Sequence, residues 1–338
     1  MNATSTPHTR RGPNARSVVV TGIGLALPGV ATYGDLLGPL PGDGGFDTAT
    51  GLSGRELRHK DRASRLALRA TGFALHDAGL TDADATFTGA ADSTAVVVST
   101  NLGIADSVCE ATDTIATAGV MALSPLGLPQ TSSNVVAGWV AIRYRLRGPN
   151  LTVCNGVTSG LDALAWARNL IVAGRAEAAV VVGVEPANDV VTKVLGEQST
   201  DAAVAVVLEP ADAAASRGAR PRATIAGYAR ARNLAAALAS AGVTEEESIG
   251  LWLVDEADAG AGQLLEATRR IDLESQLGPL SGALGVLQCA AAAAHLESDA
   301  TGKVLATAGG PRHDATGALL LTPWPAMRPS TQERGQHP

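Results

Sequence analysis

The sequence is poor in the residues that would indicate a metal site, a disulfide framework or a membrane span. It has three cysteines and six histidines among 338 residues, and none of them has the spacing of a zinc site. We therefore expect reduced thiols and a cytoplasmic location. No apolar run reaches the ~18 residues that a spanning helix needs. Because aromatic residues make up only 3% of the chain, the core must be built from Val, Leu, Ile and Ala.

The sequence also lacks a basic stripe outside its first 16 residues. Its net charge of -7 disfavours nucleic acid as a partner. Gly22 and Gly24 follow a predicted strand, but the third glycine and the acidic residue of a dinucleotide-binding fingerprint are missing. We accordingly expect no cofactor, no metal, no nucleic acid and no membrane partner.

What the sequence does contain is an alternation of buried strands and amphipathic helices. β-branched runs at residues 17–24 and 95–100 predict buried strands. Residues 62–78 have apolar side chains at helical spacing, followed by Gly79 as a C-terminal cap. This alternation predicts an α/β fold with a mostly parallel sheet.

Two units of the chain occur twice. Residues 74–81 match 237–244, each before a strand, and the helix and strand at 160–185 match those at 282–310. Preserved order and spacing indicate an internal duplication. We predict two related halves, one at 17–210 and one at 211–325, with loose tails at 1–16 and 326–338.

Residues 152–164 read Thr-Val-Cys-Asn-Gly-Val-Thr-Ser-Gly-Leu-Asp-Ala-Leu and predict a strand that turns sharply into a helix. The small residues Gly156, Ser159 and Gly160 suit such a turn. A residue at the turn lies at the positive end of the helix dipole, which lowers the pKa of a thiol and activates it. Val157 stands at this point, and its isopropyl group cannot attack a thioester.

This segment resembles the nucleophile elbow of β-ketoacyl synthases, in which a cysteine precedes Thr-Ser-Gly-Leu-Asp. The resemblance runs from Val18 to Leu321, and the segments that carry it are 19–24, 60–68, 124–125, 134–142, 148–150 and, more loosely, 278–285 and 309–310. It implies a thiolase-like fold, in which two duplicated βαβαβ halves form α/β/α/β/α layers.

The family's catalytic positions are degenerate in this chain. The family uses two histidines beside the cysteine to stabilise developing negative charge. The resemblance places Ala257 or Asp258 at the first histidine position and Pro279 at the second. Together with Val157, these residues imply that the chain has no catalytic residue and no condensing activity of its own.

Among such relatives, the chain length factors of type II polyketide synthases keep the fold without the cysteine and form a heterodimer with an active ketosynthase. The resemblance implies that this chain completes its partner's acyl tunnel and meets acyl carrier protein through the complex. The residues that it places near the tunnel are Ser107, Val108, Cys109, Ala111, Thr112, Ile115 and Trp139. Those that it places at the dimer interface are Thr152, Val153, Cys154 and Asn155.

Two other interpretations stay open. Cys154, three residues before Val157, is the candidate nucleophile of an acyltransferase or thioesterase, with His313 as a distant base. Alternatively, the chain is a homodimeric scaffold that binds acyl carrier protein through the basic run of Arg143, Arg145 and Arg147.

Overall fold

The computed structural model describes residues 17–40, 57, 59–244, 248–254, 267–298 and 301–324, so both expected tails lie outside the described residues. The strands are β1 (Val18–Ala26), β2 (Thr94–Ser99), β3 (Asn150–Val153), β4 (Ala178–Glu185), β5 (Ala202–Pro210), β6 (Ala223–Ala231), β7 (Ile249–Val254), β8 (Ala267–Asp272), β9 (Lys303–Gly309) and β10 (Thr316–Thr322). The α-helices are α1 (Arg62–Asp77), α2 (Ala105–Ala118), α3 (Val135–Tyr144), α4 (Ser159–Val172), α5 (Asp189–Leu195), α6 (Ala211–Ser216), α7 (Leu234–Ala241), α8 (Glu274–Leu277) and α9 (Leu284–Glu297).

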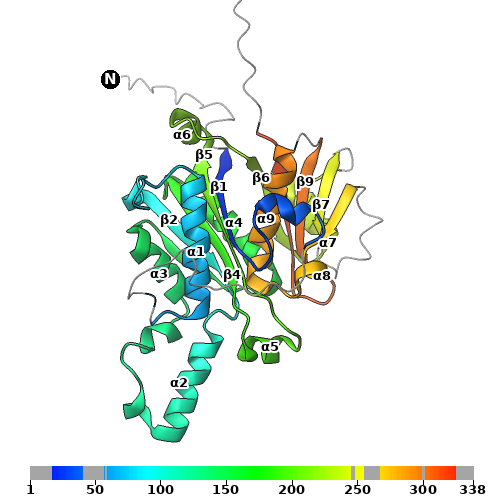
Figure 1. Ribbon diagram of the computed structural model, residues 1–338. Helices are drawn as coiled ribbons and strands as arrows, with labels where there is room; N and C mark the ends of the chain where they lie inside the picture. The colour runs from blue at the N-terminus through cyan, green and yellow to red at the C-terminus, as the bar shows by residue number, and fades with distance from the viewer. Residues whose placement is uncertain are drawn as a thin grey trace, which may run out of the picture.

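Within the described residues, the strands form a ten-stranded sheet in the order β3-β2-β4-β5-β1-β6-β10-β9-β7-β8 (Figure 1). The two halves of the sheet have the same strand order when each is followed outward from the middle of the sheet. β6 corresponds to β1, next to the middle, and β8 corresponds to β3, at the outer edge. The two halves join where Val19 pairs with Thr224 and Val20 with Ala223. The structure therefore confirms the duplication, while the boundary at 210/211 stays a prediction.

The expectation of a mostly parallel sheet is wrong. β2 and β7 pair in parallel with their neighbours, but β1, β5, β6 and β10 pair only in antiparallel fashion within the described residues. The cause is visible in the connection from β9 to β10, which spans only residues 310–315. Such a short connection cannot cross over the sheet and forces antiparallel pairing.

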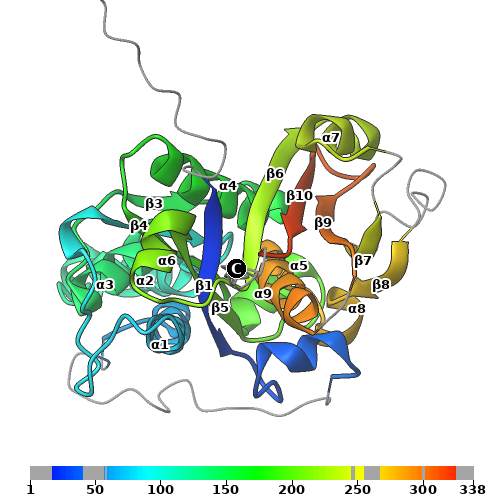
Figure 2. The same cartoon turned by 90° about the horizontal axis from the view of Figure 1, so that it is seen from above.

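The helices and the two halves of the sheet form five layers, in the order helix, sheet, helix, sheet, helix (Figure 2). α1 and α3 pack on the outer face of β2, β4 and β5, and α7 packs on the outer face of β7, β9 and β10. α4 and α9 fill the space between the two halves of the sheet. Strand residues alternate between these layers, so that Val96 faces α1 and α3 while Val97 faces the centre.

The central helices cross at a pair of glycines, one from each repeat. A Cβ atom on Gly160 of α4 would lie 2.6 Å from the backbone nitrogen of Gly285 in α9. A Cβ on Gly285 would lie 2.3 Å from the backbone nitrogen of Leu161. Only glycine permits this approach. One turn further along α9, Cys289 is fully buried, and burial raises the pKa of its thiol to about 12.

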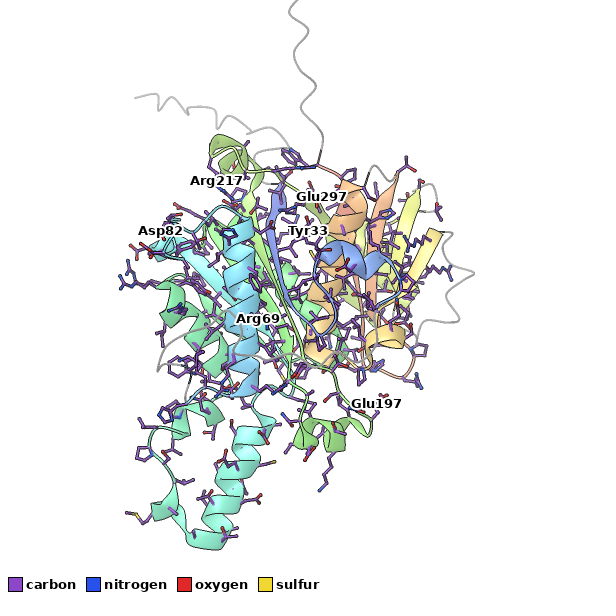
Figure 3. The ribbon with its side chains drawn as sticks, viewed as in Figure 1. Tyr33, Arg69, Asp82, Glu197, Arg217 and Glu297 are labelled. Atoms are coloured by element: carbon purple, nitrogen blue, oxygen red, sulfur yellow. The ribbon has the colours of Figure 1, made fainter. Side chains whose placement is uncertain are left out.

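A polar cluster joins the two halves at one end of the central layer. Arg222, just before β6, donates from Nη2 to Asp77 Oδ1 at 2.6 Å and from Nη1 to Glu297 Oε1 at 3.0 Å. Tyr33 donates to Glu297 Oε2 at 2.7 Å (Figure 3). Burial and this hydrogen bond to Glu297 raise the pKa of Tyr33 to about 12. The cluster connects α1 of the first half to α9 of the second.

Candidate functional site

The predicted strand, turn and helix around Val157 are present. β3 ends at Val153, a 3-10 turn covers Gly156–Thr158, and α4 begins at Ser159. Gly156 has φ of +70°, which explains the glycine at this turn. The Asn155 amide donates to Ser159 Oγ at 2.6 Å. Val157 is partly buried, and its Cγ2 atom would be 3.3 Å from a Cβ on Gly309.

Asn101, which follows β2, links this turn to a second loop. Its Nδ2 donates to Gly156 O and to Ser281 Oγ, both at 2.9 Å. Its Oδ1 accepts from Gly156 N at 3.2 Å and from Ser159 Oγ at 3.0 Å. Through these bonds Asn101 holds the turn that carries Val157 next to the loop that carries Ser281.

Pro279, which the resemblance places at the second histidine position, belongs to that same loop. Pro279 is two residues before Ser281 and is partly buried. Ser281, two residues after Pro279, is the residue of this loop that Asn101 joins to the Val157 turn. The first position, Ala257 or Asp258, lies outside the described residues.

Glu185, at the end of β4, is the buried carboxyl of this region and is only 2% exposed. It accepts hydrogen bonds from the backbone nitrogens of Asn101, Leu102 and Gly282. Burial raises the pKa of Glu185 to about 7, against the opposing effect of these backbone donors. Sequence reasoning missed both Glu185 and Asn101. The available signal was a single acidic residue directly after the unbroken apolar run 178–184.

The surroundings of Cys154 do not favour a nucleophile. The thiol is exposed and lies 3.8 Å from the carbonyl oxygen of Asn101. Partial burial and the nearby Glu185 carboxylate raise the pKa of Cys154, so the thiolate is disfavoured at neutral pH. In the described part of the chain, no hydrogen bond joins Cys154 to His313, which is exposed in the turn after β9.

The residues predicted near the tunnel lie mostly on an arm, which we define as residues 102–131. Its helix α2 has no buried residue, and the arm extends away from the body of the molecule (Figure 1). Many of its large apolar side chains are exposed, up to 94% for Met121. Trp139 lies instead on α3, where it is partly buried. The arm carries the predicted residues Ser107, Val108, Cys109, Ala111, Thr112 and Ile115.

A pocket of about 450 Å³ lies between α2 and residues 122–131, and residues 59–61 also line it. Of the predicted tunnel residues, Ser107 and Ala111 line it. Trp139 contacts two of the lining residues, since its Nε1 donates to Gln130 Oε1 at 3.3 Å and the Lys60 ammonium lies 3.8 Å from its ring centre. The remaining lining residues are His59, Lys60, Asp61, Asp106, Glu110, Thr114, Ala122, Leu123, Ser124, Gly127, Leu128, Gln130 and Thr131.

The residues predicted at the dimer interface lie on or beside β3, an edge strand of the described sheet. β3 bonds to β2 through Pro149 O and Val153 O, which accept from Val96 N and Thr100 N. Because alternate residues of a strand point their polar groups to opposite sides, the amide and carbonyl of Thr152 face away from β2.

The two helices that pack against β3 each carry an exposed apolar side chain. Ile142 belongs to α3 and Trp166 to α4, and both helices contact β3.

The basic run of Arg143, Arg145 and Arg147 does not form one face of an element. It straddles the end of α3, and Arg145 has the left-handed φ of +58°. Arg147 forms an ion pair with Asp92. These three side chains therefore do not form the continuous basic stripe that the scaffold interpretation requires.

Neither a membrane span nor a metal centre is found among the described residues. None of the helices there is both long and apolar enough to cross a bilayer. The same residues contain no group of three or more His, Cys, Asp or Glu that could hold a metal ion.

Comparison with known families and curated proteins gives matches to about half of the chain or less. The family model described as Beta-ketoacyl synthase, N-terminal domain, matches residues 31–203, more than half of the chain. The 3-oxoacyl-[acyl-carrier-protein] synthase 2 of Rhizobium meliloti (strain 1021) is 32% identical over 146 residues, which is 42% of this chain and 33% of that protein. The granaticin polyketide putative beta-ketoacyl synthase 1 of Streptomyces violaceoruber is 30% identical over 198 residues, 49% of this chain and 47% of that protein. The chain thus matches a third to about half of the length of these curated relatives.

Solved structures match over nearly the whole chain. The ishigamide ketosynthase/chain length factor superposes with a TM-score of 0.75 at 25% identity and covers 90% of this chain and 99% of that chain. A ketosynthase solved in complex with its type II polyketide synthase acyl-carrier protein gives a TM-score of 0.74 at 18% identity, covering 92% of this chain and 100% of that chain. At that identity the second match shows the fold alone. Together these structures confirm the predicted thiolase-like fold.

Proposed function

The chain belongs to the β-ketoacyl synthase family, and from this premise we propose that it is a non-catalytic subunit of a type II polyketide synthase, similar to a chain length factor. In this role it forms a heterodimer with an active ketosynthase and shapes the acyl tunnel that sets product length. The observation that carries the proposal is Val157, which occupies the turn between β3 and α4, where the resemblance places the nucleophile of the family.

The chemistry around the turn supports a silent site. An isopropyl group cannot form an acyl thioester, and the nearby Cys154 has a raised pKa rather than a lowered one. Pro279 has no proton to donate to a substrate carbonyl, so it cannot replace a histidine there. Two polar side chains of this region, Asn101 and Glu185, are engaged with the surrounding loops.

The surface supports a partner chain. β3 leaves its outer edge unpaired within the described residues and carries no charged side chain. The opposite edge strand, β8, carries Arg269 and Arg270, and charged residues of this kind protect an edge from pairing. The exposed arm adds apolar surface that a lone chain would leave in water. The heterodimer with an active ketosynthase would cover both.

The proposal is tested by acyl transfer. The chain is purified alone and with its cognate ketosynthase, and each sample is incubated with a radiolabelled acyl thioester and then denatured. We expect label on the ketosynthase only, and condensation only when the ketosynthase is present. A ketosynthase whose nucleophilic cysteine is replaced by alanine provides the control. Label that stays on this chain after denaturation, or condensation by this chain alone, would contradict the proposal; label mapped to Cys154 would support the acyltransferase interpretation.

A further inference from the structure

The buried carboxyl of Glu185 collects hydrogen-bond donors from two loops that are far apart in the sequence. Leu102 N donates to Oε2 at 3.1 Å, Gly282 N donates to Oε1 at 3.2 Å, and Asn101 N donates to Oε1 as well. The Ser281 side chain is a further hydrogen-bond partner. An ionised carboxylate has only acceptors and suits this set of donors, whereas a protonated carboxyl carries an O–H group that competes with them.

Two of these donors lie where the arm, residues 102–131, leaves the body of the molecule. Because α2 has no buried residue, packing contributes little to its position, and the attachment of the two ends of the arm matters more (Figure 1). At the far end, Gln130 Oε1 accepts from Trp139 Nε1 at 3.3 Å. At the near end, Glu185 holds the amides of Asn101 and Leu102.

The second loop bound to Glu185 is strained. Ser281 has φ of +46°, in the left-handed region that residues other than glycine rarely adopt. Its hydroxyl accepts from Asn101 Nδ2 at 2.9 Å, and its amide donates to Glu274 Oε1 at 3.3 Å. Such a conformation persists only while surrounding bonds hold it. Loss of the bonds to Glu185 would therefore let this loop relax as well.

Other titratable groups surround Glu185 on the neighbouring elements. Cys154, just after β3, lies close enough for the Glu185 carboxylate to raise the pKa of its thiol. Asp201, just before β5, accepts from the backbone that follows β4 at 2.7 Å and is paired with Arg62 of α1. Glu274 of α8 binds the backbone of the Ser281 loop. Among these groups, Glu185 is the one that holds the amides at the start of the arm.

We propose that Glu185 is a proton-controlled latch for the arm: the ionised carboxylate holds the amides of Asn101 and Leu102, and protonation releases them. The arm is part of the surface that the proposed heterodimer would cover. The consequence for assembly therefore rests on the proposed function: the chain binds its ketosynthase more tightly above neutral pH than below it.

The direction follows from which state of the arm binds the proton more tightly. While the arm is held, the backbone donors lower the pKa of Glu185 and oppose the effect of burial, so that it lies at about 7. When the donors leave and β4 stays in the sheet, the carboxyl keeps its burial and loses these donors. Its pKa then rises further, and a proton favours the released arm. Complete unfolding differs, because it removes the burial too.

Amide hydrogen exchange of the isolated chain tests the latch directly. We expect the protection factors of Asn101 and Leu102 to fall by about fivefold between pH 8 and pH 6 in the wild type. In Glu185→Gln they should be low at both pH values, since this side chain cannot ionise. The control Glu197→Gln makes the same exchange at an exposed residue and should behave like the wild type.

An internal reference separates release of the arm from general loosening of the chain. The amide of Thr100 bonds to Val153 O and not to Glu185, so its protection factor should not change over this pH range. Wild-type protection factors at Asn101 and Leu102 that do not depend on pH overturn the latch, and so does an equal fall at Thr100. This comparison needs no variant and holds even if Glu185→Gln does not fold.

Sedimentation with the cognate ketosynthase tests the consequence for assembly. The ratio of the Kd of the wild type to that of Glu185→Gln removes any titration of the partner, and we expect it to rise by about fivefold between pH 8 and pH 6. A ratio that does not change with pH overturns this consequence. If exchange depends on pH as expected but no heterodimer forms at any pH, the latch is supported and the proposed function is overturned. If a heterodimer forms and exchange at the start of the arm does not depend on pH, the latch is overturned and the proposed function is supported.

Discussion

Among single residues, Glu185 holds together parts of the site that lie far apart in the sequence. It joins Asn101 and Leu102, where the arm begins, to the loop at Gly282. Its ordinary pKa of 4.5 rises to about 7 in the folded chain because the carboxyl is buried. A carboxyl whose pKa rises on folding stabilises the chain at low pH. A carboxyl whose pKa is lowered by an ion pair stabilises the chain at higher pH instead.

The sign of this dependence follows from proton binding. The folded chain holds the Glu185 proton more tightly than the unfolded chain, so its contribution to stability is fully present below about pH 4.5 and is lost as the pH rises through about 7. We expect the free energy of unfolding of the wild type to fall, relative to Glu185→Gln, by up to about 3 kcal/mol between pH 5 and pH 8. Urea denaturation at several pH values measures this difference.

The exposed Glu177 supplies the matched control for this prediction. Glu177→Gln should show no comparable change in its difference from the wild type over the same pH range. If the wild type instead gained stability over Glu185→Gln as the pH rose, Glu185 would be ionised in the native chain throughout, and its backbone donors would outweigh its burial.

At the scale of elements, the two edge strands of the sheet differ in a way that bears on assembly. β3 has the sequence Asn-Leu-Thr-Val, whereas β8 carries two exposed arginines. Unpaired backbone groups on an edge without charge form a template for a further strand. The amide and carbonyl of Thr152 face away from β2, so they are groups to which such a further strand would bond.

Thr152→Pro should weaken the heterodimer without unfolding the chain. Proline removes the Thr152 amide, which points away from β2, and leaves the bonds of Pro149 and Val153 to β2 in place. We expect the Kd with the cognate ketosynthase to rise by about tenfold, since one hydrogen bond contributes ~1 kcal/mol and the ring adds a steric cost. Thr152→Val keeps the amide and should bind like the wild type. Equal affinities for the two variants would place the interface elsewhere.

The elements themselves could be predicted to different degrees. β1, β2 and α1 follow from apolar periodicity, because their burial is set by neighbours that the pattern already implies. The turn at Val157 follows from its small residues. The antiparallel pairing of β1, β5, β6 and β10 could not be read from periodicity, which is the same for both directions of pairing. The site residues Asn101 and Glu185 were missed because their partners lie on loops distant in sequence.

At the scale of the whole molecule, the two halves are joined by charged groups as well as by apolar packing. Arg222→Gln would leave Asp77 and Glu297 without their shared cation. The Arg222 side chain is 12% exposed, so we expect a loss of about 2 kcal/mol in the free energy of unfolding. Chemical denaturation measures it.

Arg220 offers the comparison for that measurement. Its side chain is 83% exposed, and its Nε lies 4.0 Å from Glu297 Oε1. Arg220→Gln should therefore change the free energy of unfolding by less than about 0.5 kcal/mol. Equal losses for the two variants would mean that overall charge, and not the cluster around Arg222, accounts for the effect.

The internal duplication was predictable from the repeated segments, but the contact that unites the repeats was not. Gly160 and Gly285 occupy corresponding places in the two copies, and only the fold shows that their backbones meet. A sequence pattern reports which face of a helix is apolar and does not report which helix covers that face. The central layer is for this reason a result of the structure.

Because Cys289 is fully buried, the rate at which its thiol reacts reports on transient opening of the structure around it. Cys109 and Cys154 are exposed to reagents in the native chain, whereas Cys289 is enclosed between the repeats. A disulfide-exchange reagent can reach it only when α9 separates from its surroundings. The speed at which this third sulfur reacts therefore measures how often the middle of the molecule comes apart, without any added label.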